Sequence, residues 1–117
     1  MRVCIFVLFV FVAPAALGAG NTIVKGYLID TKCGVRISEN PGMATNHTRQ
    51  CLQTGSCEQS GYGVLTEGKQ FIRFDKAGNE EAKKFLADID KAKDIKITVV
   101  GSVSSGQMSV VKIELQQ

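Results

Sequence analysis

Alternation of apolar and polar residues is the clearest pattern along the chain, and it marks three segments. Residues 22–30 alternate in this way, as a β-strand with one buried face does. Residues 62–66 and 70–74 flank a short glycine-containing connection, which is typical of a β-hairpin. Residues 95–103 and 111–115 alternate again on either side of a polar turn and predict a second hairpin.

A helical period separates the two predicted hairpins. Four apolar residues fall on one stripe of a helix, and charged residues occupy its other side. Asn79 precedes the stripe and is expected to cap the helix at its N-terminus. The stripe consists of Ala82, Phe85, Leu86 and Ile89.

The long segment 31–60 follows the first predicted strand and has a different composition. It is rich in Gly, Asn, Thr, Ser and Cys, too polar for a core, so we expect a functional or cross-linked loop there. One short helix is expected inside it. Asn46 is a suitable N-cap, His47 to Thr54 contains no helix breaker, and Gly55 is placed to end the helix in a left-handed conformation.

Strand, long loop, hairpin, helix and hairpin is the element order of a five-stranded OB-like barrel. We therefore expect a mainly β (α+β) fold with one helix between strands 3 and 4 and a short helix in the loop after strand 1. An open α+β sheet covered by the same helix is the alternative. In an OB-like barrel the loop after strand 1 borders the usual ligand face, which places segment 31–60 there.

The N-terminal segment has the features of a secretion signal. One basic residue is followed by an almost continuous apolar run that is short for a membrane span. Small residues near its end predict cleavage after Gly18, with Ala19 or Gly20 as alternatives. We expect residues 1–18 to be a signal peptide and residues 19–117 to form a single secreted or periplasmic domain. A retained membrane anchor is the other interpretation.

The net charge of the chain limits the kinds of partner that it can bind. The chain has 14 basic and 11 acidic residues, a formal net charge of +3, and loss of Arg2 with the signal peptide would lower it to +2. So small an excess does not indicate a nucleic-acid surface. We expect a monomer that binds no nucleic acid and, after cleavage, no membrane. Its expected partner is a small ligand, a metal or an envelope protein.

Three cysteines and the only histidine lie in the long loop. Cys4 leaves with the signal peptide, so Cys33, Cys51 and Cys57 remain, an odd number for an oxidising compartment. His47 precedes Cys51 by four positions, which would put both side chains on one face of the short helix. Cys33, His47, Cys51 and Cys57 are the candidate ligands of a metal site, tetrahedral for Zn²⁺ or of lower coordination for Cu⁺.

Two other interpretations of the cysteines stay open. A Cys51–Cys57 or Cys33–Cys51 disulfide would leave one thiol spare and pin the loop, which stabilises a domain by about 2–4 kcal/mol. Thiol-redox chemistry is the third interpretation, although the chain has no C-x-x-C motif to lower a thiol pKa. For Asp30, three positions before Cys33, a capping role is favoured over an outer position around a metal.

One set of residues resembles a known motif. The chain has G-Y-x-x-D-x-x-C-G at residues 26–34, H-x3-C-x5-C at residues 47–57 and V-V-G-S-V at residues 99–103. This resembles a group of small secreted bacterial proteins with G-Y-x-x-D-x-x-C-G, then H-x-x-C-x-x-x-C and a C-terminal V-x-V-x-G-x-V hairpin on an OB-like barrel. The spacings after the histidine are wider here. The resemblance implies a bacterial source and a periplasmic or secreted location, and it implies no activity.

The sequence thus predicts an exported small binding module that binds a transition metal, Zn or Cu, through its Cys/His cluster. The first alternative is a disulfide-stapled OB-like interaction domain that binds a peptide, glycan or envelope partner without metal. The second is a thiol-redox protein. No residue is assigned a catalytic role, and an enzyme is not the favoured interpretation.

Overall fold

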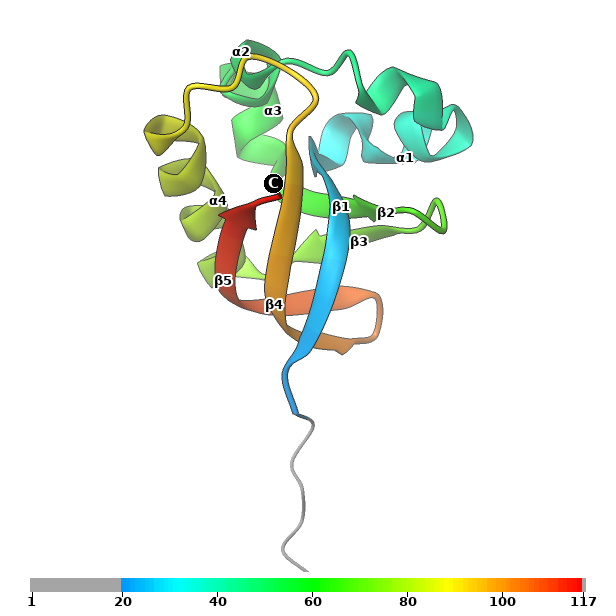
Figure 1. Cartoon of the computed structure of the whole chain (residues 1–117), viewed down its shortest axis with the longest axis vertical. Coiled ribbons are helices and arrows are strands. Elements are labelled where there is room, and N and C mark those ends of the chain that lie inside the picture. The colour runs from blue at the N-terminus through cyan, green and yellow to red at the C-terminus, as the bar shows by residue number, and fades with distance from the viewer. Residues whose placement is uncertain (1–19, 117) are drawn as a thin grey trace, which may run out of the picture.

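The computed structural model describes residues 20–116, which form a five-stranded mixed sheet with helices around it (Figure 1). The strands are β1 (Thr22–Asp30), β2 (Tyr62–Thr66), β3 (Phe71–Phe74), β4 (Lys96–Ser104) and β5 (Gln107–Leu115). The helices are α1 (Thr31–Glu39), α2 (Arg49–Leu52), α3 (Gly55–Ser60) and α4 (Lys76–Asp88), with a 3-10 turn η1 (Pro41–Ala44). The expected α+β class, with five strands and one helix between the third and fourth, is therefore confirmed.

The sheet closes on itself in the order β1-β2-β3-β5-β4, because β1 pairs with a strand on each side. The second half of β1 pairs antiparallel with β2, and the first part of β1 pairs antiparallel with β4. Gly26 and Tyr27 therefore have partners in both strands. Gly26 has no room for a side chain, since a Cβ there would collide with the carbonyl group of Leu65. β3 and β5 form the one parallel pair among the described strands, and β4 and β5 form the long C-terminal hairpin.

The main core fills the interior of the closed sheet and continues beneath α4. Burial alternates along β4, as expected for a strand with one inward face, and Val99 is completely buried. Ala82 and Leu86 of the predicted helical stripe are buried against this core. Tyr62 joins α2 to it, because its hydroxyl donates a 2.8 Å hydrogen bond to the carbonyl oxygen of Leu52.

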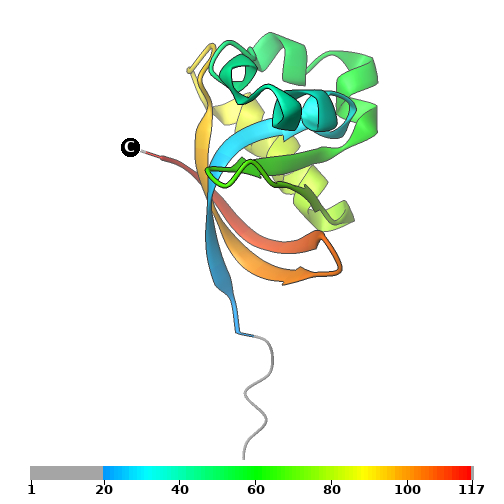
Figure 2. The ribbon, with the colours of Figure 1, turned by 90° about the vertical axis from the view of Figure 1, so that its right-hand side faces the viewer.

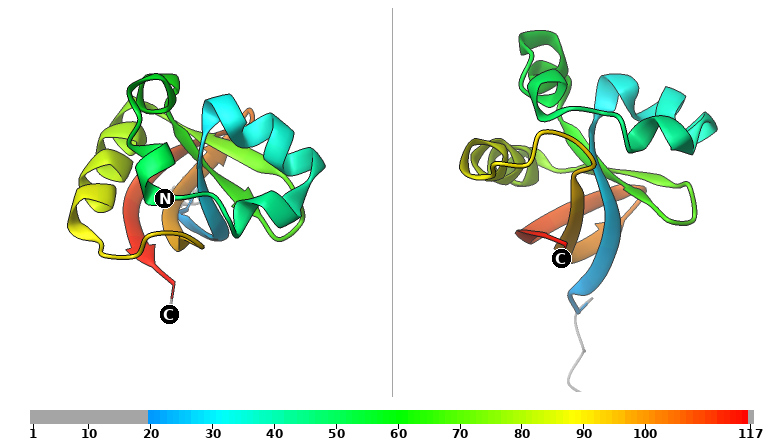
Figure 3. Two further views of the ribbon diagram at one scale, coloured as in Figure 1. Left: turned by 90° about the horizontal axis from the view of Figure 1, so that it is seen from above. Right: turned by 45° about the horizontal axis from the view of Figure 1, so that its top comes forward.

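Segment 31–60 forms a helical layer over the end of the sheet at which β1 ends (Figures 2 and 3). A second, smaller hydrophobic cluster joins this layer to the sheet, with Ile37 of α1 buried and Phe71 of β3 packed against it. Gly34 lets α1 approach closely, because an ideal Cβ at this position would lie 2.7 Å from carbon atoms of the Phe71 ring. The layer is therefore part of the folded core and not a loose loop.

The prediction of a single helix from His47 to Thr54 is wrong in the bounds of the helix and in the residue that caps it. The structure has four helical stretches in the long segment, and α2 covers only part of the expected helix. Thr48 caps α2: its backbone is extended, and its Oγ1 accepts a 3.0 Å hydrogen bond from the N–H of Cys51. Asn46 instead lies in the turn before it, with its N–H donating to the carbonyl oxygen of Met43.

Two further helix ends differ from the expectation. Gly55 begins α3 after an extended Thr54, so it does not end a helix in the left-handed conformation. Asp75, not Asn79, caps α4, because its Oδ1 accepts a 2.8 Å hydrogen bond from the N–H of Gly78. Asn79 lies in the first turn and uses its Oδ1 to accept a hydrogen bond from the N–H of Tyr62. For Asn79, the contact with Tyr62, 17 positions away in sequence, replaces the expected capping role.

The expected signal peptide, residues 1–18, lies outside the described residues, as does its alternative end at Ala19. Among residues 20–116, no helix has the length and apolar character needed to cross a membrane.

Candidate functional site

Asp30 is the last residue of β1 and the centre of the site. Its side chain is completely buried, the only charged side chain in the described core. Oδ2 accepts a 3.0 Å hydrogen bond from the N–H of Cys33, which caps α1 at its N-terminus. The expected capping role is therefore confirmed, and it turns the chain sharply from strand into helix. The cap also fixes the position of Cys33 in the first helical turn.

His47 holds the other oxygen of the same carboxylate. Its Nε2 lies 2.8 Å from Asp30 Oδ1, and only 10% of its side chain is exposed. Burial by itself would raise the pKa of Asp30, but hydrogen bonds from His47 and from the N–H of Cys33 outweigh burial and lower this pKa. The carboxylate is thus ionised at neutral pH and only accepts hydrogen bonds, so that Nε2 of His47 carries the proton.

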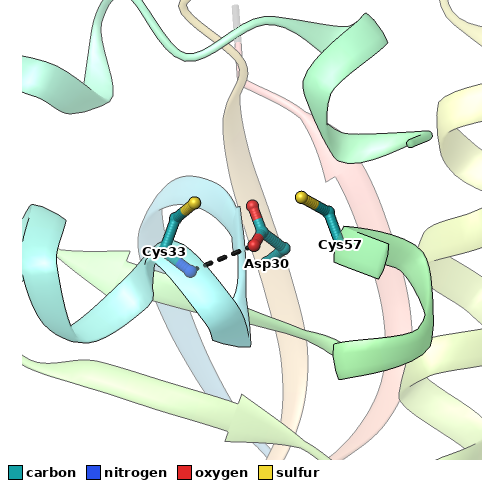
Figure 4. A group of neighbouring side chains, drawn as sticks. All are labelled: Asp30, Cys33 and Cys57. Carbon is teal, nitrogen blue, oxygen red and sulfur yellow. Dashed lines mark hydrogen bonds between the residues drawn. The ribbon is translucent and has the colours of Figure 1, made fainter. Parts of the chain in front are cut away.

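Cys33 and Cys57 lie on either side of this carboxylate. Figure 4 shows both sulfur atoms turned toward Asp30, one from α1 and the other from the first turn of α3. One ligand atom from each of the three residues lies within 4.8 Å of the other two, and all three residues are buried. Two soft sulfur donors and one carboxylate therefore converge on a single buried point.

Cys51 extends the group of sulfur atoms. It lies in α2, is partly exposed and is followed by α3, which carries Cys57. Burial and then the neighbouring Cys57 thiol raise the pKa of Cys51. Burial, followed by the negative charge of Asp30, raises the pKa of Cys33 to about 11. Both thiols therefore carry their protons at neutral pH.

One cation approaches the sulfur atoms from the exposed side. Nη2 of Arg36, one helical turn after Cys33, lies 3.7 Å from the Cys33 Sγ atom. A guanidinium in this position favours the thiolate once the proton has left. The site thus combines three thiols, a buried carboxylate held by an imidazole, and a positive charge at its rim.

The four candidate ligands predicted from the sequence lie at different places relative to the buried Asp30 carboxylate. Cys33 and Cys57 meet at Asp30, and all three cysteines are free thiols in the structure. His47 reaches the group through Asp30 and does not share a helix with Cys51, because α2 begins at Arg49. Metal binding by these four residues stays a prediction.

Asp30 is the residue that sequence reasoning undervalued. Its spacing to Cys33 indicated a cap, and the cap is present. A cap on a surface loop would be solvated, whereas this one is fully buried between two sulfur atoms. The signal available in the sequence was an acidic residue directly after the apolar residues Leu28 and Ile29 at the end of a strand.

Comparisons with protein-family models, with curated proteins and with solved structures found no match to this chain. What the chain does is therefore inferred from its own side chains.

Proposed function

We propose that this protein is an exported OB-type domain that binds a soft or borderline transition-metal ion, Zn²⁺ or Cu⁺. Cys33 and Cys57 supply the central thiolates, Cys51 lies beside them as a third, and Asp30 supplies an oxygen. The observation that carries this proposal is the meeting of two buried sulfur atoms and one buried carboxylate oxygen within 4.8 Å of one another.

The fold supports the placement of such a site. A closed strand order of β1-β2-β3-β5-β4, a parallel β3–β5 pair and a helix between β3 and β4 are what an OB-type barrel has. In that class the loop after strand 1 borders the ligand face, and here this segment brings all the candidate donors except Asp30. Asp30 ends strand 1 itself.

The donor set suits the chemistry of these ions. Thiolates prefer Cu⁺ and Zn²⁺, whereas sites for Mg²⁺ and Ca²⁺ are built from oxygens. The thiols must lose their protons on binding, and the ion offsets the resulting charge, which the low-dielectric surroundings would otherwise oppose. Arg36, at 3.7 Å from Cys33 Sγ, offsets part of any remaining negative charge.

His47 has a different role in this proposal from the ligand role expected from the sequence. An imidazole that donates to a carboxylate fixes the orientation of that carboxylate, as residues around metal ligands commonly do. The 2.8 Å contact between His47 Nε2 and Asp30 Oδ1 has this geometry. We therefore assign His47 to the positioning of Asp30.

The two alternatives differ from this proposal in the state of the thiols. A disulfide-stapled interaction module would need one bridge among Cys33, Cys51 and Cys57. A thiol-redox protein would need a thiolate at neutral pH, and the raised pKa values of Cys33 and Cys51 argue against it. The exported location is proposed from the N-terminal segment and from the resemblance to secreted bacterial proteins.

The test is a metal titration of reduced, exported-form protein, residues 19–117, under anaerobic conditions. Zn²⁺ and Cu⁺ are each supplied from a competing chelator, and bound metal is measured by elemental analysis after gel filtration. We expect about one ion per chain, and loss of binding in Cys33→Ser and in Cys57→Ser.

The matched control is Met43→Leu, which removes an exposed thioether outside the cluster. It should bind as the unaltered protein does. Binding that survives both cysteine substitutions, or no binding of either ion by the reduced protein, would show that the proposed site is wrong.

A further inference from the structure

Cys33 and Cys57 form a close pair of sulfur atoms. Their Sγ atoms lie within 4.8 Å of each other and of an oxygen of Asp30, and the two residues are 8% and 7% exposed. A disulfide joins two sulfur atoms at about 2 Å. Rotation of a cysteine side chain between staggered positions moves its sulfur by a distance similar to the remaining gap, so side-chain rotation can bring this pair to bonding distance.

The two helices that carry these sulfur atoms are held together by hydrogen bonds next to them. Lys32 directly precedes the first cysteine, and Ser56 directly precedes the second. Nζ of Lys32 donates a 3.3 Å hydrogen bond to Oγ of Ser56, and the N–H of Lys32 donates a 3.1 Å hydrogen bond to Oγ of Ser60. α1 and α3 thus keep the two cysteines paired without depending on an ion between them.

We propose that a peroxide oxidises Cys33 and Cys57 from metal-bound thiolates to a disulfide, and that this bridge releases the metal ion. This inference rests on the metal site proposed above and adds its regulation. A sulfur in a disulfide is no longer a thiolate ligand, so the same two atoms hold either the ion or the bridge. Coordination keeps both thiols ionised at neutral pH, so neither has to lose a proton before it reacts.

The oxidation balances with one molecule of hydrogen peroxide. One thiolate attacks a peroxide oxygen, the O–O bond breaks, hydroxide leaves, and the sulfur becomes a sulfenic acid. The second thiolate attacks the sulfenic sulfur, the S–S bond forms, and a second hydroxide leaves. Both hydroxide ions take a proton from solvent and become water. Two electrons pass from the two sulfurs to the peroxide, so that two thiolates, one hydrogen peroxide and two protons give one disulfide and two waters.

The burial of the two sulfur atoms favours a small oxidant over a large one. Residues that are 8% and 7% exposed leave room for hydrogen peroxide to reach a sulfur atom. Oxidised glutathione would have to bring its central sulfur–sulfur bond, with a peptide on each side, into contact with the attacking thiolate. We therefore expect a peroxide to react and a bulky disulfide not to react.

The buried carboxylate of Asp30 favours the bridge over two free thiolates. Its oxygens stay in place through the N–H of Cys33 at 3.0 Å and Nε2 of His47 at 2.8 Å. Without an ion, two thiolates within 4.8 Å of this carboxylate would place three negative charges in buried surroundings, where like charges repel strongly. A disulfide is neutral and leaves only the charge of Asp30.

The experiment uses reduced protein, residues 19–117, loaded with Zn²⁺, which does not itself change oxidation state. Hydrogen peroxide is added, and released Zn²⁺ is followed with a chromogenic chelator against a sample without peroxide. We expect complete loss of bound Zn²⁺ at the rate at which a Cys33–Cys57 bridge appears, and recovery of Zn²⁺ binding after reduction with dithiothreitol. Oxidised glutathione at the same concentration should release no Zn²⁺ over the same time.

Peptide mass spectrometry without reduction assigns the bridge. Trypsin leaves Cys33 on one peptide and the other two cysteines together on residues 50–69. Chymotrypsin cleavage after Leu52 then separates Cys51 from Cys57. A joined pair of peptides that carry Cys33 and Cys57 therefore identifies the expected bridge.

Met43→Leu is the matched control, because Met43 is an exposed thioether that peroxide also oxidises. This variant should release Zn²⁺ at the rate of the unaltered protein. A bridge that includes Cys51, oxidation to sulfinic acid without a bridge, or Zn²⁺ that stays bound to the bridged protein would each overturn the inference and leave the metal site standing. Release that disappears in Met43→Leu, or that is equally fast with oxidised glutathione, would overturn it as well. Reduced protein that binds neither Zn²⁺ nor Cu⁺ would instead refute the proposed function, and the regulation with it.

Discussion

Replacement of Asp30 by alanine tests whether the centre of the site also stabilises the fold. The side chain is completely buried and accepts two hydrogen bonds, from the N–H of Cys33 at 3.0 Å and from Nε2 of His47 at 2.8 Å. Loss of an N-cap costs about 1 kcal/mol, and a hydrogen bond to a charged group contributes about 1.5–3 kcal/mol. The expected loss in free energy of unfolding for Asp30→Ala is thus about 2.5–4 kcal/mol.

Asp75→Ala is the matched control. Asp75 caps α4 through the same kind of bond, a 2.8 Å contact from the N–H of Gly78, but it is only partly buried and its second contact is with the exposed hydroxyl of Ser109. Its loss should cost about 1 kcal/mol. Urea unfolding of both variants, followed by circular dichroism, gives the two free energies. Equal costs for Asp30→Ala and Asp75→Ala would refute the idea that the buried contact with His47 contributes to stability.

The pH dependence of Asp30→Ala provides a second readout with a defined sign. Because the pKa of Asp30 is lower in the folded protein, its contribution to stability is present above the ordinary aspartate range and is lost as the pH falls through the folded value. The difference between unaltered protein and Asp30→Ala should therefore be largest at neutral pH and should decrease in acid, below about pH 4. If the difference in free energy of unfolding between the two proteins stays constant down to pH 2, the ionised Asp30 does not stabilise the fold.

Three further substitutions probe the surroundings of the site. Gly34→Ala should lower the free energy of unfolding by about 1–3 kcal/mol, because its Cβ would lie 2.7 Å from the Phe71 ring; urea unfolding measures this, and Phe71→Leu in the same chain should recover part of the loss. The reduced protein should lose stability between about pH 9 and pH 11, because the pKa of Cys33, raised to about 11, contributes stability only below that range, and Cys33→Ala should not show this loss. The difference in free energy of unfolding, on the order of 2–3 kcal/mol, is measured by urea unfolding at pH 9 and at pH 11. The same change in free energy of unfolding with pH in both proteins would be evidence against this assignment. Tyr62→Phe should cost about 1 kcal/mol through loss of the bond to the Leu52 carbonyl oxygen, and thermal unfolding that is unchanged would show that this bond contributes nothing.

The strands were predictable from the sequence because their pattern is local. The bounds of β1 follow from the alternation in residues 22–30. Both hairpins follow from short polar connections between two strand-forming runs. The amphipathic stripe of α4 was also predictable, with Ala82 and Leu86 on its buried side. These features depend on side chains two to four positions apart, which share one face of a strand or a helix whatever the rest of the chain does.

The ends of the helices were not predictable in the same way. Thr48 competes with Asn46 as a cap, and the choice is made by contacts with the segment before β4, where Thr48 bridges to Lys93 and the N–H of Arg49 donates to the Ala92 carbonyl oxygen at 2.7 Å. Residues so far apart in sequence have no local pattern that relates them. The number of helices in segment 31–60 was missed for the same reason.

The sequence by itself determined which chemical groups this protein has for function: three thiols, one imidazole and an aspartate at the end of a strand. Only the tertiary structure decided how they are related. Closure of the sheet around β1 buries Asp30, and the packing of α1 and α3 over its end sets Cys33 and Cys57 on either side of the carboxylate. The physical reason is that burial and donor distances are set by packing between segments, whereas strand and helix periods are set by backbone geometry within a segment.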